Sequence, residues 1–175
     1  MLRRITNFID ENSMKLLYLC LVQSHLDYCC EIWGLRYNMQ TDRIIKLQKR
    51  AARIILKCNM YKPSKEMFAE LKWLPFNLRV TYFKCVFMFK CLKGLSSNFY
   101  CNTFKFACNS HNFNTRFSAN NNVITAEVHT ECFKHSLFYS SIIMWNNLPS
   151  DIKQSQSLSV FKKKVKIHLF KSQTV

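Results

Sequence analysis

The fold is decided by the stretch PFNLRVTYFKCVFMFKCLKG, residues 75–94. Pro75 suits the first turn of a helix, where its missing N–H is not needed, and Gly94 suits the C-terminal stop. Most side chains between them are apolar. A helix that is apolar over most of its surface has to be covered by other elements. The sequence therefore predicts a central core helix over residues 76–93.

The amino-acid composition favours helices over sheets. The 175-residue chain holds only 2 glycines and 3 prolines, whereas sandwiches and doubly wound sheets need many tight turns that prefer glycine. Hydrophobic residues make up 49% of the chain, which suffices for a sizeable buried core. The composition therefore predicts a mainly α protein.

Apolar periodicity and capping residues predict further helices on both sides of the core helix. They are expected at 14–33 between a Ser13 cap and Gly34, at 42–57 after Thr41, at 65–71 after Ser64, at 133–147 before Pro149, and at 157–171 after a serine cap. Residues 96–122 show no period and predict a long irregular loop, with short strands at 113–117 and 123–129. Together these features predict a compact helical domain of five to six helices, with room for one small β-hairpin.

The run at residues 16–22 is the longest clean apolar stretch of the chain. It is apolar on every side of a helix, so we expect it to be buried. A transmembrane helix needs about 20 such residues, so none is expected.

The charge of the chain points to an anionic partner. Lys and Arg number 26 against 10 Asp and Glu, for a net charge of +16. Phosphate backbones and anionic membrane surfaces are the usual partners of such a chain. Nucleic acid is favoured, because the positive charge alternates with apolar segments instead of forming one tail. The alternative is an ordinary solvated surface.

The helix expected at 42–57 places five basic residues within one narrow arc, beside an apolar stripe. No acidic residue lies between Asp42 and Glu66, so the pairing typical of a solvated face is missing. We therefore expect phosphate binding there, and a second basic patch on the last helix. The residues expected to bind nucleic acid are Arg43, Lys46, Arg50, Arg53 and Lys57, with Lys162, Lys163 and Lys166.

The sequence offers no catalytic site. Its two glycines stand alone, which excludes the phosphate-binding loops of nucleotide enzymes and the nucleophile elbow of hydrolases. Its acidic residues are scattered, whereas two-metal phosphoryl transfer needs several carboxylates at one point. We expect no catalytic residue and no cofactor.

The cysteines and histidines allow one metal site. The pairs Cys108 and His111, and His129 and Cys132, have the spacing of zinc ligands and flank the irregular loop. A sequence with nine cysteines also produces such pairs by chance, and loop thiols with surface imidazoles are the favoured interpretation. The start of the chain does not resemble a signal peptide, so reduced thiols and an intracellular location, nuclear or cytoplasmic, are expected.

Several stretches in a fixed order resemble the C-terminal region of reverse transcriptases from non-LTR (LINE, jockey-like) retrotransposons. The resemblance covers nearly the whole chain, from about residue 16 to 170. The stretches are LY at 17–18, SHLDYC at 24–29, IWG at 32–34, LQKRAARII at 47–55, LKWLP at 71–75 with Arg79, FKCLKGL at 89–95, Thr115-Arg116, WNNLP at 145–149, SL at 157–158 and FKKK at 161–164.

In that family this region follows the palm and corresponds to the thumb and its C-terminal extension. The resemblance implies a parent protein that copies RNA into DNA, with its catalytic carboxylates in the palm and its endonuclease upstream. It implies a truncated fragment that binds nucleic-acid backbone and does no catalysis. The expected segments are a thumb-like helical part at 1–95, an irregular loop at 96–130 and a helical extension at 131–175.

Two other functions stay open. The first is a protein-interaction module, or a functionless element remnant, whose apolar surface once faced the missing palm. The second, which the lack of clustered carboxylates argues against, is an active enzyme. The tryptophans Trp33, Trp73 and Trp145 are expected to pack in the core, although they could also stack on bases. The expected partners are RNA or DNA backbone, and the palm or another protein; a membrane is not expected.

Overall fold

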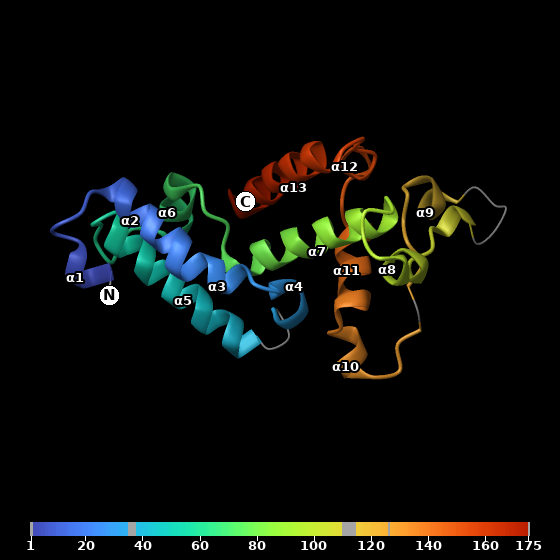
Figure 1. The fold of residues 1–175 in the computed structure, drawn as a ribbon, viewed down its shortest axis with the longest axis horizontal. Coiled ribbons are helices and arrows are strands. Elements are labelled where there is room, and N and C mark those ends of the chain that lie inside the picture. The colour runs from blue at the N-terminus through green and yellow to red at the C-terminus, as the bar shows by residue number, and fades with distance from the viewer. Residues whose placement is uncertain (1, 35–37, 110–114, 126, 175) are drawn as a thin grey trace. The chain divides into compact units, whose positions relative to one another are not determined.

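The computed structural model describes residues 2–34, 38–109, 115–125 and 127–174, which fold mainly into α-helices (Figure 1). The predicted mainly α class is confirmed, although the helices are shorter and more numerous than the five to six expected. No helix among these residues is both long and apolar enough to cross a membrane.

The β-hairpin predicted from the sequence is wrong for the described residues. They form no strand, and the only pairing of this kind is one antiparallel bridge between Phe106 and Val123. The strand expected at 113–117 lies partly outside the described residues, and its described end begins helix α9, Arg116–Ala119. Thr115 and Ser118 cap this helix reciprocally, and such a local signal has no apolar periodicity to reveal it.

The chain divides into two units, Met1–Val80 with Phe170–Val175, and Thr81–Leu169. The division falls inside two long helices, α7 (Phe76–Leu92) and α13 (Leu158–Thr174). It is a division by contacts and leaves the three segments expected from the sequence as a prediction.

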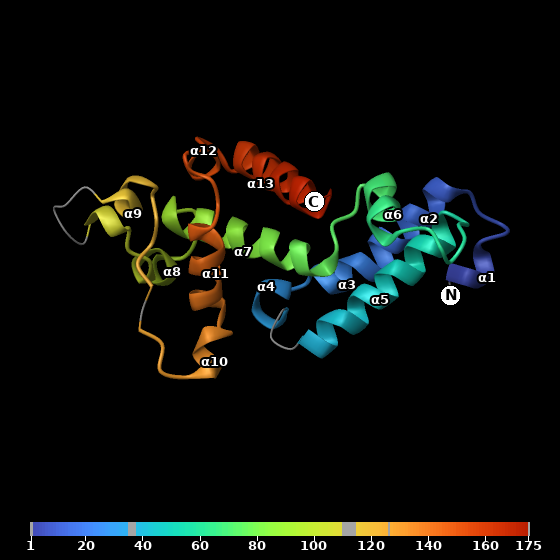
Figure 2. The same ribbon diagram turned by 180° about the vertical axis from the view of Figure 1, so that it is seen from behind.

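The first unit is built around α5. Its helices are α1 (Leu2–Ile5), α2 (Glu11–Tyr18), the π-helical segment η1 (Leu19–Gln23), α3 (Ser24–Asp27), α4 (Cys30–Trp33), α5 (Asn38–Ile55) and α6 (Ser64–Leu71). Helix α5 contacts α1, α2 and α6, as Figures 1 and 2 show from opposite sides. The core between them includes Met14, Ala52 and Met67, each at most 1% exposed.

The helix expected at 14–33 is interrupted. It begins earlier than expected, because the Asp10 carboxylate, not Ser13, accepts hydrogen bonds from the backbone N–H groups of Asn12 and Ser13. It ends at Asp27, where Tyr28 turns extended and Cys29 takes a left-handed conformation with φ 50°.

The expected burial of residues 16–22 is wrong. Only Tyr18 of this run is buried, whereas Leu16 is 61%, Leu19 44% and Leu21 48% exposed. An apolar stretch shows that a face can be covered, but burial also needs a neighbouring element, and this unit places none over these side chains.

The other predicted helices of the first unit are found with altered ends. Helix α5 begins at Asn38, so Thr41 lies inside it and is buried instead of capping it. Its apolar stripe is only partly covered, since Leu47 is 64% exposed. Helix α6 follows the prediction within one residue.

The second unit packs around the C-terminal part of α7. Its other helices are α8 (Asn98–Thr103), the 3₁₀ turn η2 (Ala107–Asn109), α9, α10 (Glu131–Lys134), α11 (Leu137–Asn146), α12 (Ser150–Lys153) and the part of α13 up to Leu169. The helix predicted at 133–147 is thus divided into α10 and α11, and short helices replace much of the expected loop. In the core Phe161 stacks on Phe89 with ring centroids 4.3 Å apart.

The apolar positions expected for the last helix are confirmed. Phe161, Val165 and Leu169 are buried and Leu158 is half-buried. The Ser157 hydroxyl accepts a hydrogen bond from the N–H of Val160 at 3.3 Å, as an N-cap serine does.

Candidate nucleic-acid interface

The basic residues of α5 form an exposed face. Arg43, Lys46 and Arg50 are all exposed, and Lys57 is exposed just beyond the end of the helix. No ion pair involves any of these four side chains in the described part of the chain. Because an unpaired and hydrated cation can exchange its water for a phosphate oxygen, this face is suited to a polyanion.

Two of the five expected residues differ from the prediction in detail. Lys57 does not continue the helical arc, because it has a left-handed backbone with φ 48° after the last turn. Arg53 is half-buried, and its Nε atom is buried without a hydrogen-bond partner among the described atoms. Four of the five side chains are therefore placed to meet a ligand in solution.

The opposite face of α5 is held by buried polar contacts. The Gln48 side chain is 2% exposed, and its Oε1 atom accepts a hydrogen bond from the Phe76 N–H at 2.8 Å. Its Nε2 atom donates to the Tyr18 hydroxyl at 3.4 Å. These bonds fix the rotation of α5, so that its basic face is turned to solvent.

The same contacts continue into an ion pair between two residues of the family-like stretches. The Tyr18 hydroxyl donates to Gln23 Oε1 at 3.2 Å, and Gln23 Nε2 donates to Asp27 at 2.7 Å. Asp27 accepts two hydrogen bonds from Arg79. Burial alone would lower the pKa of Arg79, but hydrogen bonding to Asp27 and its charge raise that pKa above the usual value.

The second expected patch lies on α13. Lys162, Lys163 and Lys166 are exposed there, on the side of the helix away from Phe161 and Val165. They belong to the second unit, whereas the α5 residues belong to the first. Each patch is therefore described by itself.

The tryptophans divide between core and surface. Trp73 stacks on Tyr18 with ring centroids 4.1 Å apart, and Trp145 is 2% exposed, so the core prediction holds for both. Trp33 is 40% exposed and so departs from that prediction. Its Nε1 donates to the Tyr28 carbonyl at 2.8 Å and its ring stacks on Phe76, which ties α4 to the start of α7.

The expected zinc ligands are not assembled. Cys108, His129 and Cys132 are all exposed, and His111 lies outside the described residues. No group of three or more metal-binding side chains gathers among the residues that the structure places. We therefore propose no zinc site.

Three cysteines are buried thiols. Burial raises the pKa of Cys30 and Cys85 to about 12 and that of Cys91 to about 11. Such thiols stay protonated near neutral pH and act as small apolar side chains, so they are poor nucleophiles.

Lys153 is a buried cation that the sequence did not reveal. It is 4% exposed, and its Nζ atom donates to Asn122 Oδ1 at 2.6 Å and to the Asn146 carbonyl at 3.0 Å. Burial lowers the pKa of this lysine. Its two amide acceptors replace part of the water that the ammonium group loses, which makes it a structural residue of the second unit.

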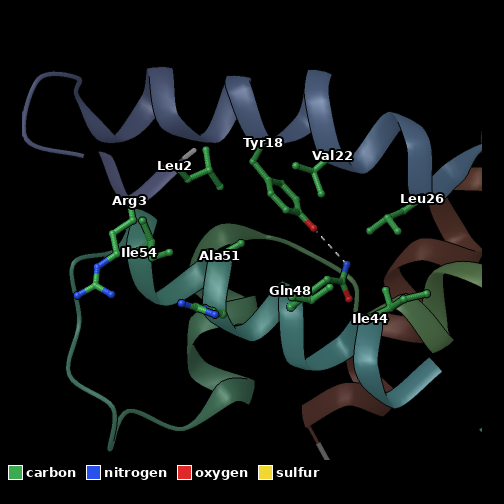
Figure 3. Close-up of a pocket in the computed structure, with 11 residues that line it drawn as sticks. Leu2, Arg3, Tyr18, Val22, Leu26, Ile44, Gln48, Ala51 and Ile54 are labelled. Atoms are coloured by element: carbon green, nitrogen blue, oxygen red, sulfur yellow. Dashed lines mark hydrogen bonds between the residues drawn. The ribbon is translucent and has the colours of Figure 1, made fainter. Parts of the chain in front are cut away.

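An open apolar groove beside the basic face was also missed. Tyr18, Val22 and Leu26 project from the α2–α3 helix toward Ile44 and Ile54 on α5 (Figure 3). The space between them measures about 420 Å³. The exposed apolar residues at 16–22 were the signal for it, and they were assigned to the core instead.

Comparisons of the chain with protein-family models, curated proteins and solved structures found no match.

Proposed function

We propose that this chain binds the phosphate backbone of nucleic acid through the basic face of α5, as the C-terminal region of a reverse transcriptase of the non-LTR retrotransposon type. In this proposal it performs no catalysis itself, and it acts inside the cell, in the nucleus or the cytoplasm. The observation that carries the proposal is the set of four exposed and unpaired basic side chains at α5. The ordered family-like stretches supply the template–primer duplex as the ligand.

The dimensions of α5 suit a duplex backbone. From Arg43 to Arg53 the helix rises about 15 Å, at about 1.5 Å per residue. The same length of duplex carries about nine phosphate charges, so one face of the helix meets several of them. Lysine and arginine contacts to phosphates position a protein but carry no base information, so binding should depend little on sequence.

The test is a titration with a labelled RNA–DNA duplex at several salt concentrations. The parent protein should bind with a steep negative slope of log K against log salt, because each neutralised phosphate releases counterions. A variant with Arg43→Gln, Lys46→Gln, Arg50→Gln and Lys57→Gln should bind more weakly and with a shallower slope. Arg53 is kept, since it is half-buried and its loss would affect folding.

A matched control separates the face from total charge. The control carries Arg4→Gln, Lys65→Gln, Lys105→Gln and Arg116→Gln, which are also exposed and remove the same two arginines and two lysines. It should retain most of the affinity. Equal losses in both variants would show that only net charge matters, and no binding by the parent at low salt would disprove the proposal.

A further inference from the structure

The groove of the first unit has apolar walls that stay open to solvent. One wall is Tyr18, Val22 and Leu26, at every fourth position of the α2–α3 helix, and the other is the exposed edge of α5. Val22 is 37% and Leu47 is 64% exposed. Leaving such side chains in water is unfavourable, and covering them would release about 25 cal/mol per Å² of apolar surface.

The rim of the groove is positively charged. Arg3 of α1 and Arg50 of α5 are its only charged lining residues, and none of its eleven lining residues is acidic. Both arginines are exposed, and no ion pair is formed by either one within the described ranges. The groove therefore presents cations beside an apolar floor, and a complementary ligand carries carboxylates beside an apolar ridge.

The groove is preformed. Its floor includes Tyr18 and Gln48, which are joined by the hydrogen bond drawn in Figure 3 and are both at most 2% exposed. The Tyr18 ring is held from behind by Trp73. A ligand thus meets side chains that are already ordered, which lowers the entropic cost of binding.

We infer that this groove binds an amphipathic helix of a partner protein, with an apolar ridge and flanking glutamates or aspartates. The apolar edge of α5 from Ile44 to Ile54 is about 15 Å long, which matches about three turns of a helix and ridge residues at i, i+3 or i+4, and i+7. The flanking carboxylates would pair with Arg3 and Arg50.

Two other ligands fit less well. Phosphates would be placed against valine, leucine and isoleucine side chains that offer them no hydrogen bonds. A second copy of this chain would bring a second +16 charge, and its amphipathic helix α13 carries lysines where carboxylates are needed. The inference goes beyond the proposed nucleic-acid binding and does not rest on it.

The test uses fluorescent peptides and fluorescence anisotropy with the full chain. The probe is a helical peptide of about 15 residues, long enough to be marginally helical, with leucines at i, i+3, i+7 and i+10 and glutamates beside them. A second peptide has the same composition with the leucines spread around the helix, and a third has lysines in place of the glutamates. Only the first should bind saturably.

The variant Leu47→Gln tests the location of the site. Glutamine keeps a good helix propensity and adds no charge. It should weaken peptide binding about tenfold, as expected when an interface leucine is lost. Leu16→Gln is the matched control, because Leu16 is the same residue type at 61% exposure and does not line the groove. It should bind the peptide as the parent does.

The outcomes separate the two proposals. Leu47→Gln should leave the affinity for the RNA–DNA duplex unchanged, because no charge is altered. Absence of saturable peptide binding, equal binding of the three peptides, or equal affinities of Leu47→Gln and the parent would each disprove the groove as a helix-binding site. Val22→Gln, on the opposite wall, provides an independent second variant with the same expectation.

Discussion

The ion pair between Asp27 and Arg79 links residues that lie far apart in the sequence. Both side chains are about a quarter exposed, at 22% and 26%. Arg79→Gln leaves the Asp27 carboxylate without its charged partner, so we expect the free energy of unfolding to fall by about 2 kcal/mol, within the range for hydrogen bonds to charged groups. Urea denaturation followed by circular dichroism measures this change.

An exposed ion pair supplies the control for that measurement. Lys62 and Glu70 form an ion pair in which the glutamate is 50% exposed. Lys62→Gln should lower the free energy of unfolding by less than about 0.5 kcal/mol, because exposed pairs are screened by solvent. Similar losses in Arg79→Gln and Lys62→Gln would contradict the structural role given to the Asp27–Arg79 pair.

The buried thiol of Cys85 makes stability depend on pH. Its pKa is about 12 in the folded protein against an ordinary value of 9.0, so above pH 9 the unfolded chain loses the proton while the folded chain keeps it. Stability should therefore fall as the pH rises from 9 toward 12. One such thiol contributes a slope of at most about 1.4 kcal/mol per pH unit.

The variant Cys85→Ala isolates this effect. It lowers stability at every pH by leaving a small cavity, but its free energy of unfolding should decline less steeply above pH 9 than that of the parent. Groups common to both proteins, such as Lys153, cancel in the comparison of slopes. Parallel slopes in the two proteins would show that the thiol does not titrate differently on folding.

At the scale of elements, the two glycines perform different tasks. A Cβ atom on Gly34 would lie 2.5 Å from Val80 Cγ2 and closer still to the Cys30 carbonyl oxygen, whereas one on Gly94 would meet nothing within 4 Å. Gly94 has a left-handed backbone with φ 69° instead. Packing therefore requires glycine at the end of α4, and conformation favours it at the end of α7.

Alanine and asparagine variants should distinguish these requirements. Gly34→Ala should cost about 2–3 kcal/mol through overpacking, and Gly94→Ala about 1 kcal/mol through the left-handed conformation. Asparagine tolerates that conformation, so Gly94→Asn should recover part of the loss while Gly34→Asn should not. Thermal unfolding of the four variants checks this, and recovery at Gly34 would refute the packing argument.

The long helices could be predicted from the sequence because their signals are local and agree with one another. Proline and glycine mark the ends of α7, and a serine cap with a regular apolar stripe marks α13. The short helices between them could not be predicted, because a four-residue helix such as α9 depends on one capping interaction. The break after Asp27 was hidden for a similar reason, since nothing in the residue type Cys29 announces a left-handed backbone.

The candidate site was predictable in its residues but not in its surroundings. The basic face of α5 follows from spacing alone, because the positions within one helix are fixed by its geometry. The groove beside it depends on how α2, α3 and α5 pack, and that arrangement is set by contacts across many residues, such as Tyr18 with Gln48. Apolar spacing on one helix does not reveal whether another element covers it.

At the scale of the whole molecule, the charge of +16 is spread over both units. If both basic patches contact the same duplex, changing Lys162, Lys163 and Lys166 to glutamine should reduce the salt slope further in a protein that already lacks the α5 charges. Each lost phosphate contact should lower the slope by about 0.9. An unchanged slope in the combined variant would show that the α13 lysines do not take part.

The π-helical segment η1 gives the groove an unusual genetic vulnerability. The Ser24 N–H bonds to the Leu19 carbonyl five residues back, so this turn holds about one residue more than an α-helical turn. An in-frame deletion of the codon for Cys20, which is exposed, would let the segment relax into a regular α-helix. The N-terminal part of α2 would then rotate by about 100° relative to Val22 and Leu26, and Tyr18 would leave the groove. A single deletion event could thus remove the peptide-binding surface while leaving the basic residues of α5 in place, so that descendants of this sequence could lose one ligand and keep the other.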